Sequence, residues 1–171
     1  MKTIFVDMDG VLCDFDKRYA EFFGVTTREV RHNKSRKEYR RLWNDFIDRD
    51  GFATLDLYPG ATQLIEWLNI QKAEKCILSS SGGMERHNDV VAQKIKWLCS
   101  HGITWPTAIV PGRKFKAGFA GIDNALIDDH PENVEQFTKS GGFGILHESD
   151  RKWNTTYQLE LWLEGKHEVV S

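Results

Sequence analysis

At 171 residues the chain is long enough for one core of ordinary size with a small insertion, but not for two full domains. Its hydrophobic content of 40%, charged content of 28% and formal net charge of −2 exclude a disordered composition and a strongly basic one. We therefore expect a globular protein without a stable nucleic-acid partner. No signal-peptide pattern and no run of about 18 apolar residues is present, so we expect no membrane association. The three widely spaced cysteines favour a reducing, cytoplasmic setting, and a homodimer is compatible with the sequence.

Short apolar runs alternate with amphipathic stretches along most of the chain, which predicts βαβ units and a parallel sheet. Residues 15–59 are the exception, because they contain no convincing strand and look like an inserted helical cap. Within this cap, Thr26 to Glu29 has capping-box spacing, and a helix is predicted from Arg36 to Asp48. We thus expect a three-layer α/β core of residues 1–14 and 60–171. Its five strands are expected at Ile4–Val6, Cys76–Leu78, Ala108–Val110, Ala125–Ile127 and Phe143–Leu146.

Helices are expected between these strands. Val91, Ile95 and Leu98 fall at helical spacing, and Pro131 can begin a helix because its missing N–H costs little there.

Two carboxylates, Asp7 and Asp9, directly follow the first predicted strand, and Gly10 permits a sharp turn after them. Parallel sheets bind ligands at the carboxyl ends of their strands, so both side chains are expected at that edge. Several carboxylate oxygens in one place suit Mg²⁺, a hard cation. The pair therefore predicts a magnesium site.

Three further segments place polar residues after predicted strands, and each also has a simpler interpretation. Ser79 and Ser80 begin a Ser/Gly segment that could present donors to an anion, or form an ordinary turn. Asp128 and Asp129 could join the cation site, or cap the helix that follows. Lys116 lies in a basic run that could face the site, or be a solvated helix surface. Because parallel strands share one carboxyl edge, we expect these groups to converge and hold a phosphoryl group.

The ordered set of motifs resembles the haloacid dehalogenase superfamily of phosphotransferases over nearly the whole chain. Asp7-Met8-Asp9-Gly10-Val11 matches its first motif, Ser79 the second, Lys116 the third and Asp128-Asp129 the fourth. The opening from Phe5 to Leu12, the segment from Leu57 to Ala61 and the run from Leu126 to Asp129 are similar, more narrowly, to the small 5′(3′)-deoxyribonucleotidases and their phage and bacterial relatives. The resemblance implies a Rossmann-like core with a helical cap inserted after the first strand.

The resemblance also implies a role for each site residue. Asp7 would be the nucleophile that forms an aspartyl-phosphate, and Asp9 would act as acid and then as base. Mg²⁺ would be held by the Asp7 carboxylate, the Asp9 backbone carbonyl and Asp129. Asp128 would position Lys116, although the sequence leaves open which acid of that pair contacts the ion.

Ser79, with Ser80 beside it, would bind the phosphoryl oxygens, and Lys116 would stabilise charge in the transition state. Lys114 is the competing candidate for the lysine, and Lys116 is preferred because it stands at a helix opening and is better spaced from Asp128. An acid at position 9 favours phosphoryl transfer over dehalogenation.

The cap is expected to select the substrate. Aromatic residues of the cap could stack on a nucleobase, or they could form the small core of the cap; they are Phe15, Trp43, Phe46 and Phe52. A cluster of basic residues in the same insert could attract an anionic substrate, or be a solvated helix face; its members are Arg28, Arg31, Lys34, Arg36, Lys37, Arg40 and Arg41.

We therefore predict a Mg²⁺-dependent phosphatase for nucleoside monophosphates, with deoxyribonucleotides favoured. A nucleic-acid 3′-phosphate end or a small phosphorylated metabolite is the alternative substrate. A phosphorelay receiver also combines a parallel sheet with aspartates, a hydroxyl and a lysine, but its acceptor aspartate should end a strand that here ends in Ser79. A catalytically inactive binding protein is disfavoured, since no expected catalytic position is missing.

Overall fold

A computed structural model describes residues 1–148 and 151–166, apart from the side chains of Arg31, Lys152 and Trp153. Five strands form one parallel sheet in the order β3-β2-β1-β4-β5. The predicted α/β fold is thereby confirmed, and every predicted strand lies within an observed one. The strands are β1 (Thr3–Val6), β2 (Glu74–Ser80), β3 (Thr107–Val110), β4 (Asn124–Asp128) and β5 (Phe143–Leu146).

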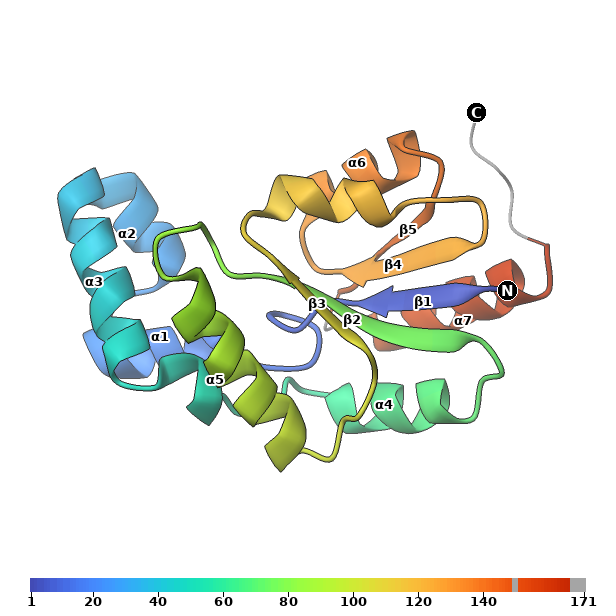
Figure 1. Cartoon of the computed structure of the whole chain (residues 1–171), viewed down its shortest axis with the longest axis horizontal. Coiled ribbons are helices and arrows are strands. Elements are labelled where there is room, and N and C mark those ends of the chain that lie inside the picture. Colours follow the sequence, from blue (N-terminus) through green and yellow to red (C-terminus); the bar gives the residue numbers. More distant parts are fainter. Residues whose placement is uncertain (149–150, 167–171) are drawn as a thin grey trace.

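Helices cover both faces of the sheet (Figure 1). One face packs against α4 (Ala61–Asn69), α5 (His87–Ser100) and α7 (Lys152–Leu163). The other packs against α6 (Pro131–Lys139), which begins at the predicted proline, and against the 3-10 helix η2 (Arg113–Phe119). None of the helices in the described ranges has the length and apolar character needed to cross a bilayer.

Strand β1 lies at the centre of the sheet, between β2 and β4. Its side chains alternate between the two faces, with Ile4 and Val6 in one apolar cluster and Phe5 in the other. Val6 pairs with Ile77 of β2 and with Ile127 of β4. The residue after Val6 therefore emerges at the middle of the carboxyl edge, where neighbouring strands can supply groups from both sides.

The cap follows β1 and lies beside the carboxyl ends of the strands (Figure 1). It consists of α1 (Phe15–Phe23), α2 (Thr27–Asn33), α3 (Arg36–Asp48) and the 3-10 helix η1 (Gly51–Thr54). Helix α3 has the predicted bounds, and the predicted capping box is present at Thr26 and Glu29.

Helix α5 holds the end of the cap through buried polar side chains. The Nε2 of Gln93 donates to the Ile47 carbonyl at 2.7 Å, and its Oε1 accepts from the Phe52 N–H at 3.1 Å. The indole Nε1 of Trp97 donates to the Leu55 carbonyl at 2.8 Å. The Trp97 and Phe52 bonds pair backbone groups in the interior, and the Gln93 amide adds to the bond that the Ile47 carbonyl already accepts from the Asp50 N–H.

Candidate active site

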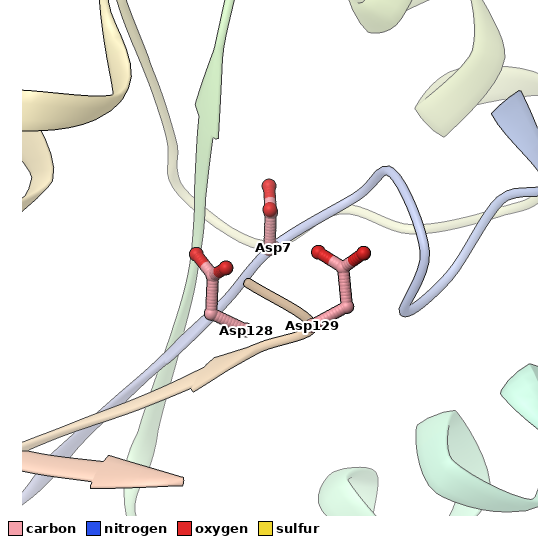
Figure 2. Close-up of side chains that lie close together, drawn as sticks. All are labelled: Asp7, Asp128 and Asp129. Atoms are coloured by element: carbon pink, nitrogen blue, oxygen red, sulfur yellow. The ribbon is translucent and has the colours of Figure 1, made fainter. Parts of the chain in front are cut away.

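Three carboxylates gather where β1 and β4 end. Asp7 follows β1, Asp128 ends β4, and Asp129 comes next in the chain. Each offers a ligand oxygen, and these oxygens lie within 4.8 Å of one another. Figure 2 shows the three carboxyl groups pointing away from the strand ends toward the same space. This is an all-oxygen donor set of the kind that a divalent hard cation prefers.

Gly10 allows the loop after β1 to pass close to this cluster. Its φ is +75°, and a Cβ built there would lie 2.3 Å from Oδ2 of Asp129. A side chain at position 10 would therefore be strained and would displace the Asp129 carboxylate.

Lys116 joins two of the acids. Its Nζ lies 2.7 Å from Oδ2 of Asp7 and 2.7 Å from Oδ2 of Asp128, and the side chain is 1% exposed. Asp128 also accepts hydrogen bonds from Nδ2 of Asn133 and from the backbone N–H of His130. Asp128 is thus held by buried donors, whereas Asp129 lines the cavity described below.

The crowding of acids shifts their protonation equilibria. Without a bound cation, loss of hydration and the charge of Asp7 raise the pKa of Asp129 to about 8, and Asp128 and Asp9 act in the same direction. The same two causes raise the pKa of Asp128 to about 6, against the opposing effect of Lys116. Burial alone would lower the pKa of Lys116, but Asp7 and Asp128 raise it, so the ammonium stays charged. A divalent cation among these acids would offset their repulsion.

Asp9 has a partner that sequence reasoning missed. The fully buried Lys94 on α5 places its Nζ 2.6 Å from Oδ2 of Asp9. The same Nζ donates to Oγ of Ser79 at 2.8 Å and to the Ser80 carbonyl at 3.0 Å. Lys94 therefore ties the loop after β1 to the end of β2.

The helix predicted from the spacing of Val91, Ile95 and Leu98 is confirmed as α5, but its buried face does not follow those three residues. Ile95 is 40% exposed, and Val90, Lys94 and Trp97 face the core instead. These three positions have the i, i+4 and i+7 spacing of one helix face, which was visible in the sequence. A search for apolar residues alone misses this face, because its middle position is a lysine. A lysine on an otherwise apolar stripe marks a buried charge that needs an acid nearby.

A cavity of about 930 Å³ lies above these groups, between the sheet edge and the cap. This volume is of the size that ligand pockets have. Among the predicted site residues, those that line it are Asp7, Asp9, Lys116, Asp129, Ser80, Phe15 and Trp43.

Ser79 does not line this cavity. It is 0% exposed, and its hydroxyl accepts from Lys94. Strand β2 continues to Ser80, and successive side chains of a strand point to opposite faces. The hydroxyl at the cavity is therefore that of Ser80.

Phe46 is corrected from a substrate-binding residue to a core residue of the cap. It is 0% exposed and packs against the rings of Phe15, Tyr19, Phe22 and Phe52, with centroids 5.1 to 5.7 Å apart. No face of its ring is open to a base, and Phe52, which is 1% exposed, is likewise a core residue and not a stacking residue. The alternative interpretation, in which an inserted cap must bury a core of its own, holds for this residue.

The cavity also has lining residues that sequence reasoning did not single out. Arg113 opens the basic run that contains Lys116, and its place in that run was the signal available in the sequence. Lys114, the competing candidate, is exposed and does not line the cavity. The remaining additions come from the loop after β2, from the residue before the cap, and from the cap and its end; they are Gly82, Asp14, Asp16, Tyr39, Tyr58 and Pro59.

Comparison with known proteins agrees with this geometry. The model of the family described as "5' nucleotidase, deoxy (Pyrimidine), cytosolic type C protein" matches residues 1–170. The human protein named "5'(3')-deoxyribonucleotidase, cytosolic type" is 27% identical over 114 residues, an alignment that covers 57% of this chain and 56% of the human protein. The match thus spans little more than half of that relative.

Solved structures share the fold at low sequence identity. A Had-superfamily hydrolase from Ehrlichia chaffeensis is 13% identical with a TM-score of 0.53, over 97% of this chain and 98% of the other. A hydrolase from Streptococcus pneumoniae TIGR4 is 14% identical with a TM-score of 0.51, over 96% of this chain and 100% of the other. The chain therefore has the haloacid dehalogenase fold and belongs to the family of cytosolic type C deoxy 5′-nucleotidases.

Proposed function

We propose that this protein is a Mg²⁺-dependent phosphatase that hydrolyses nucleoside monophosphates through an aspartyl-phosphate. The observation that carries the proposal is the position of Asp7 at the end of the central strand, beside Lys116 and at the base of a cavity with aromatic walls. Family membership and the name of the human relative favour a nucleotide substrate. They also favour a phosphatase over a phosphorelay receiver.

In the first half-reaction, a carboxylate oxygen of Asp7 attacks phosphorus, and the bond from phosphorus to the ester oxygen breaks. The departing oxygen takes a proton from Asp9, which also lines the cavity. In the second half-reaction, Asp9 removes a proton from water as the water attacks phosphorus. The bond to Asp7 then breaks, which releases phosphate and restores both carboxyl groups.

Lys116 and Ser80 would assist both steps. The Lys116 ammonium is fixed between Asp7 and Asp128, so its charge stands where negative charge develops and needs no reorganisation. The Ser80 hydroxyl is at the cavity and can donate to a phosphoryl oxygen. Ser79 would act indirectly, because its hydroxyl accepts a hydrogen bond from Lys94 below the site.

The acids would hold the cation unequally. Asp7 and Asp129 have carboxylates at the cavity, and the Asp9 carbonyl would complete the protein's share of ligands. Asp128 is occupied by Lys116 and Asn133, which favours a role in fixing Lys116. Bound Mg²⁺ would screen the phosphate from the carboxylate that attacks it.

Phe15 and Trp43 are the aromatic residues of the cap that could stack on the base, since both line the cavity. The preferred base and sugar, the cytoplasmic setting and a homodimeric state stay predictions.

The test measures phosphate release from 5′- and 3′-nucleotides and sugar phosphates, with Mg²⁺ or with EDTA. We expect release from nucleotides in Mg²⁺, none in EDTA, and none from the Asp7→Asn variant. Equal inactivity of wild type and Asp7→Asn on every substrate would refute the phosphatase assignment. A preference for sugar phosphates would refute the substrate while leaving the mechanism intact.

A further inference from the structure

A second cavity of about 500 Å³ adjoins the active-site cavity. It lies between α3 of the cap and the loop that follows β2. Tyr39, Trp43 and Gly82 line both cavities, so these residues form a shared wall. Gly82 has a φ of +79°, and a Cβ there would lie 2.7 Å from Cζ2 of Trp43, so the loop and the ring are in close contact.

One face of α3 supplies both aromatic and basic groups to the second cavity. Arg36, Tyr39, Arg40 and Trp43 lie at i, i+3, i+4 and i+7, which places them on one side of the helix. The rings of Tyr39 and Trp43 are stacked, with centroids 6.3 Å apart and planes 18° apart. Aromatic platforms beside cations are how proteins hold single-stranded nucleotide chains without reading sequence.

The two cavities differ in charge. Five aspartates face one arginine and one lysine in the active-site cavity, namely Asp7, Asp9, Asp14, Asp16 and Asp129 against Arg113 and Lys116. In the second cavity, three arginines face one glutamate, namely Arg36, Arg40 and Arg86 against Glu85. If a substrate carries an anionic group that extends beyond the active site, the charges therefore favour placing that group in the second cavity.

Two of these arginines are available to a ligand. Arg36 is exposed and forms no ion pair with a carboxylate in the described part of the chain. Arg40 pairs with Glu85, but the two side chains are 64% and 56% exposed, and surface pairs of this kind are weak enough for a phosphate to replace. Arg86 is less available to a ligand, because its side chain is 26% exposed and forms ion pairs with Asp48 at 2.8 Å and with Asp89 at 2.5 Å.

We propose that the second cavity binds a second phosphate group of the substrate, one nucleotide away from the phosphate that Asp7 attacks. The substrates then include terminally phosphorylated short single-stranded oligonucleotides or nucleoside bisphosphates, which present the same anion to Arg36 and Arg40. This inference rests on the proposed phosphatase function. A base between the two phosphates can stack on the shared aromatic wall.

The test compares kcat/KM for phosphate release from dithymidylate phosphorylated at its 5′ or 3′ end, from thymidine 3′,5′-bisphosphate, and from the thymidine monophosphates. We expect at least one substrate with a second phosphate to equal or exceed its monophosphate. This preference should fall about tenfold in the variant R36Q/R40Q, which removes two charged donors. A preference for phosphorylated dithymidylate would show that the second cavity binds the phosphate of a phosphodiester. A preference for the bisphosphate would show that it binds a free phosphate group.

The control variant R28Q/K37Q removes the same charge from exposed positions of the cap that line neither cavity, and should keep the wild-type preference. The proposal fails if both double variants change the preference alike, or if every substrate with a second phosphate is at least tenfold poorer than its monophosphate. Equilibrium binding of phosphorylated dithymidylate and of thymidine monophosphate to Asp7→Asn, followed by tryptophan fluorescence, tests the second cavity without turnover. Inactivity toward all monophosphates therefore counts against the phosphatase assignment alone, whereas equal affinity of Asp7→Asn for both ligands counts against the second cavity.

Discussion

Replacement of Lys94 by methionine should destabilise the protein and slow its chemistry. The change removes three hydrogen bonds of a fully buried ammonium, to Asp9, Ser79 and the Ser80 carbonyl. Each buried acceptor left without its donor costs about 1 kcal/mol. The Asp9 carboxylate is 30% exposed, so water replaces part of its lost ion pair, and methionine also avoids the cost of burying a charge. The net loss of unfolding free energy should be about 2 kcal/mol.

The same substitution frees Asp9 to rotate. Because Asp9 has to reach the leaving oxygen in one step and a water in the next, loss of its fixed position should lower kcat about 10- to 100-fold. KM should change little, since Lys94 is buried below the cavity and does not line it.

Urea unfolding and steady-state kinetics measure the two effects. Lys96→Met is the matched control, because Lys96 lies on the same helix and its side chain is 68% exposed. Its Nζ is 3.7 Å from Oδ2 of Asp50. This control should lower the free energy of unfolding by less than about 1 kcal/mol and leave kcat at the wild-type value. A Lys94→Met protein with the stability and kcat of this control would refute the reasoning, because the Lys94 bonds would then fix nothing.

Further predictions concern the metal site and the cap. Gly10→Ala should weaken Mg²⁺ binding at least about tenfold by calorimetry, because its Cβ would meet the Asp129 carboxylate; unchanged affinity would contradict the close approach. In EDTA, the folded protein should hold more protons than the unfolded chain between about pH 4 and 8, since folding raises the pKa of Asp129 to about 8 and that of Asp128 to about 6. Its melting temperature should therefore fall as the pH rises through this window and recover when Mg²⁺ is added at pH 8, and a flat profile in EDTA would count against the acid cluster. Phe46→Ala should lose about 3–5 kcal/mol of stability, whereas Trp43→Ala should mainly raise KM; the reverse pattern would show that the two rings are wrongly assigned.

The strands and the acid pairs could be predicted because their signal is local. Each strand is a short apolar run, and the residues after β1 and β4 then meet at one edge by the geometry of a parallel sheet. The choice between Ser79 and Ser80 could not be made in this way. It depends on where β2 ends and on its register with β1, in which Ile77 pairs with Val6. A shift of one residue exchanges the two hydroxyls between the faces of the strand.

The second cavity also escaped sequence reasoning, because its walls come from α3 and from a loop about 40 positions further along the chain. The basic residues of the cap looked alike in sequence, and packing alone separates Arg36 and Arg40, which line a cavity, from Arg28 and Lys37, which do not. The side chain of Arg31 lies outside the described part of the structure.

The way in which α5 holds the cap limits how the cap can move. The apolar cluster that contains Val6 of the sheet continues without a break into Tyr19 and Phe46 of the cap, and Gln93 and Trp97 hold the backbone around Ile47, Phe52 and Leu55. Opening of the cap as one rigid body would expose this cluster and break all of these bonds. The cap and the core are therefore expected to unfold as a single cooperative unit, and a cap grafted from a relative would need its own α5 to do so.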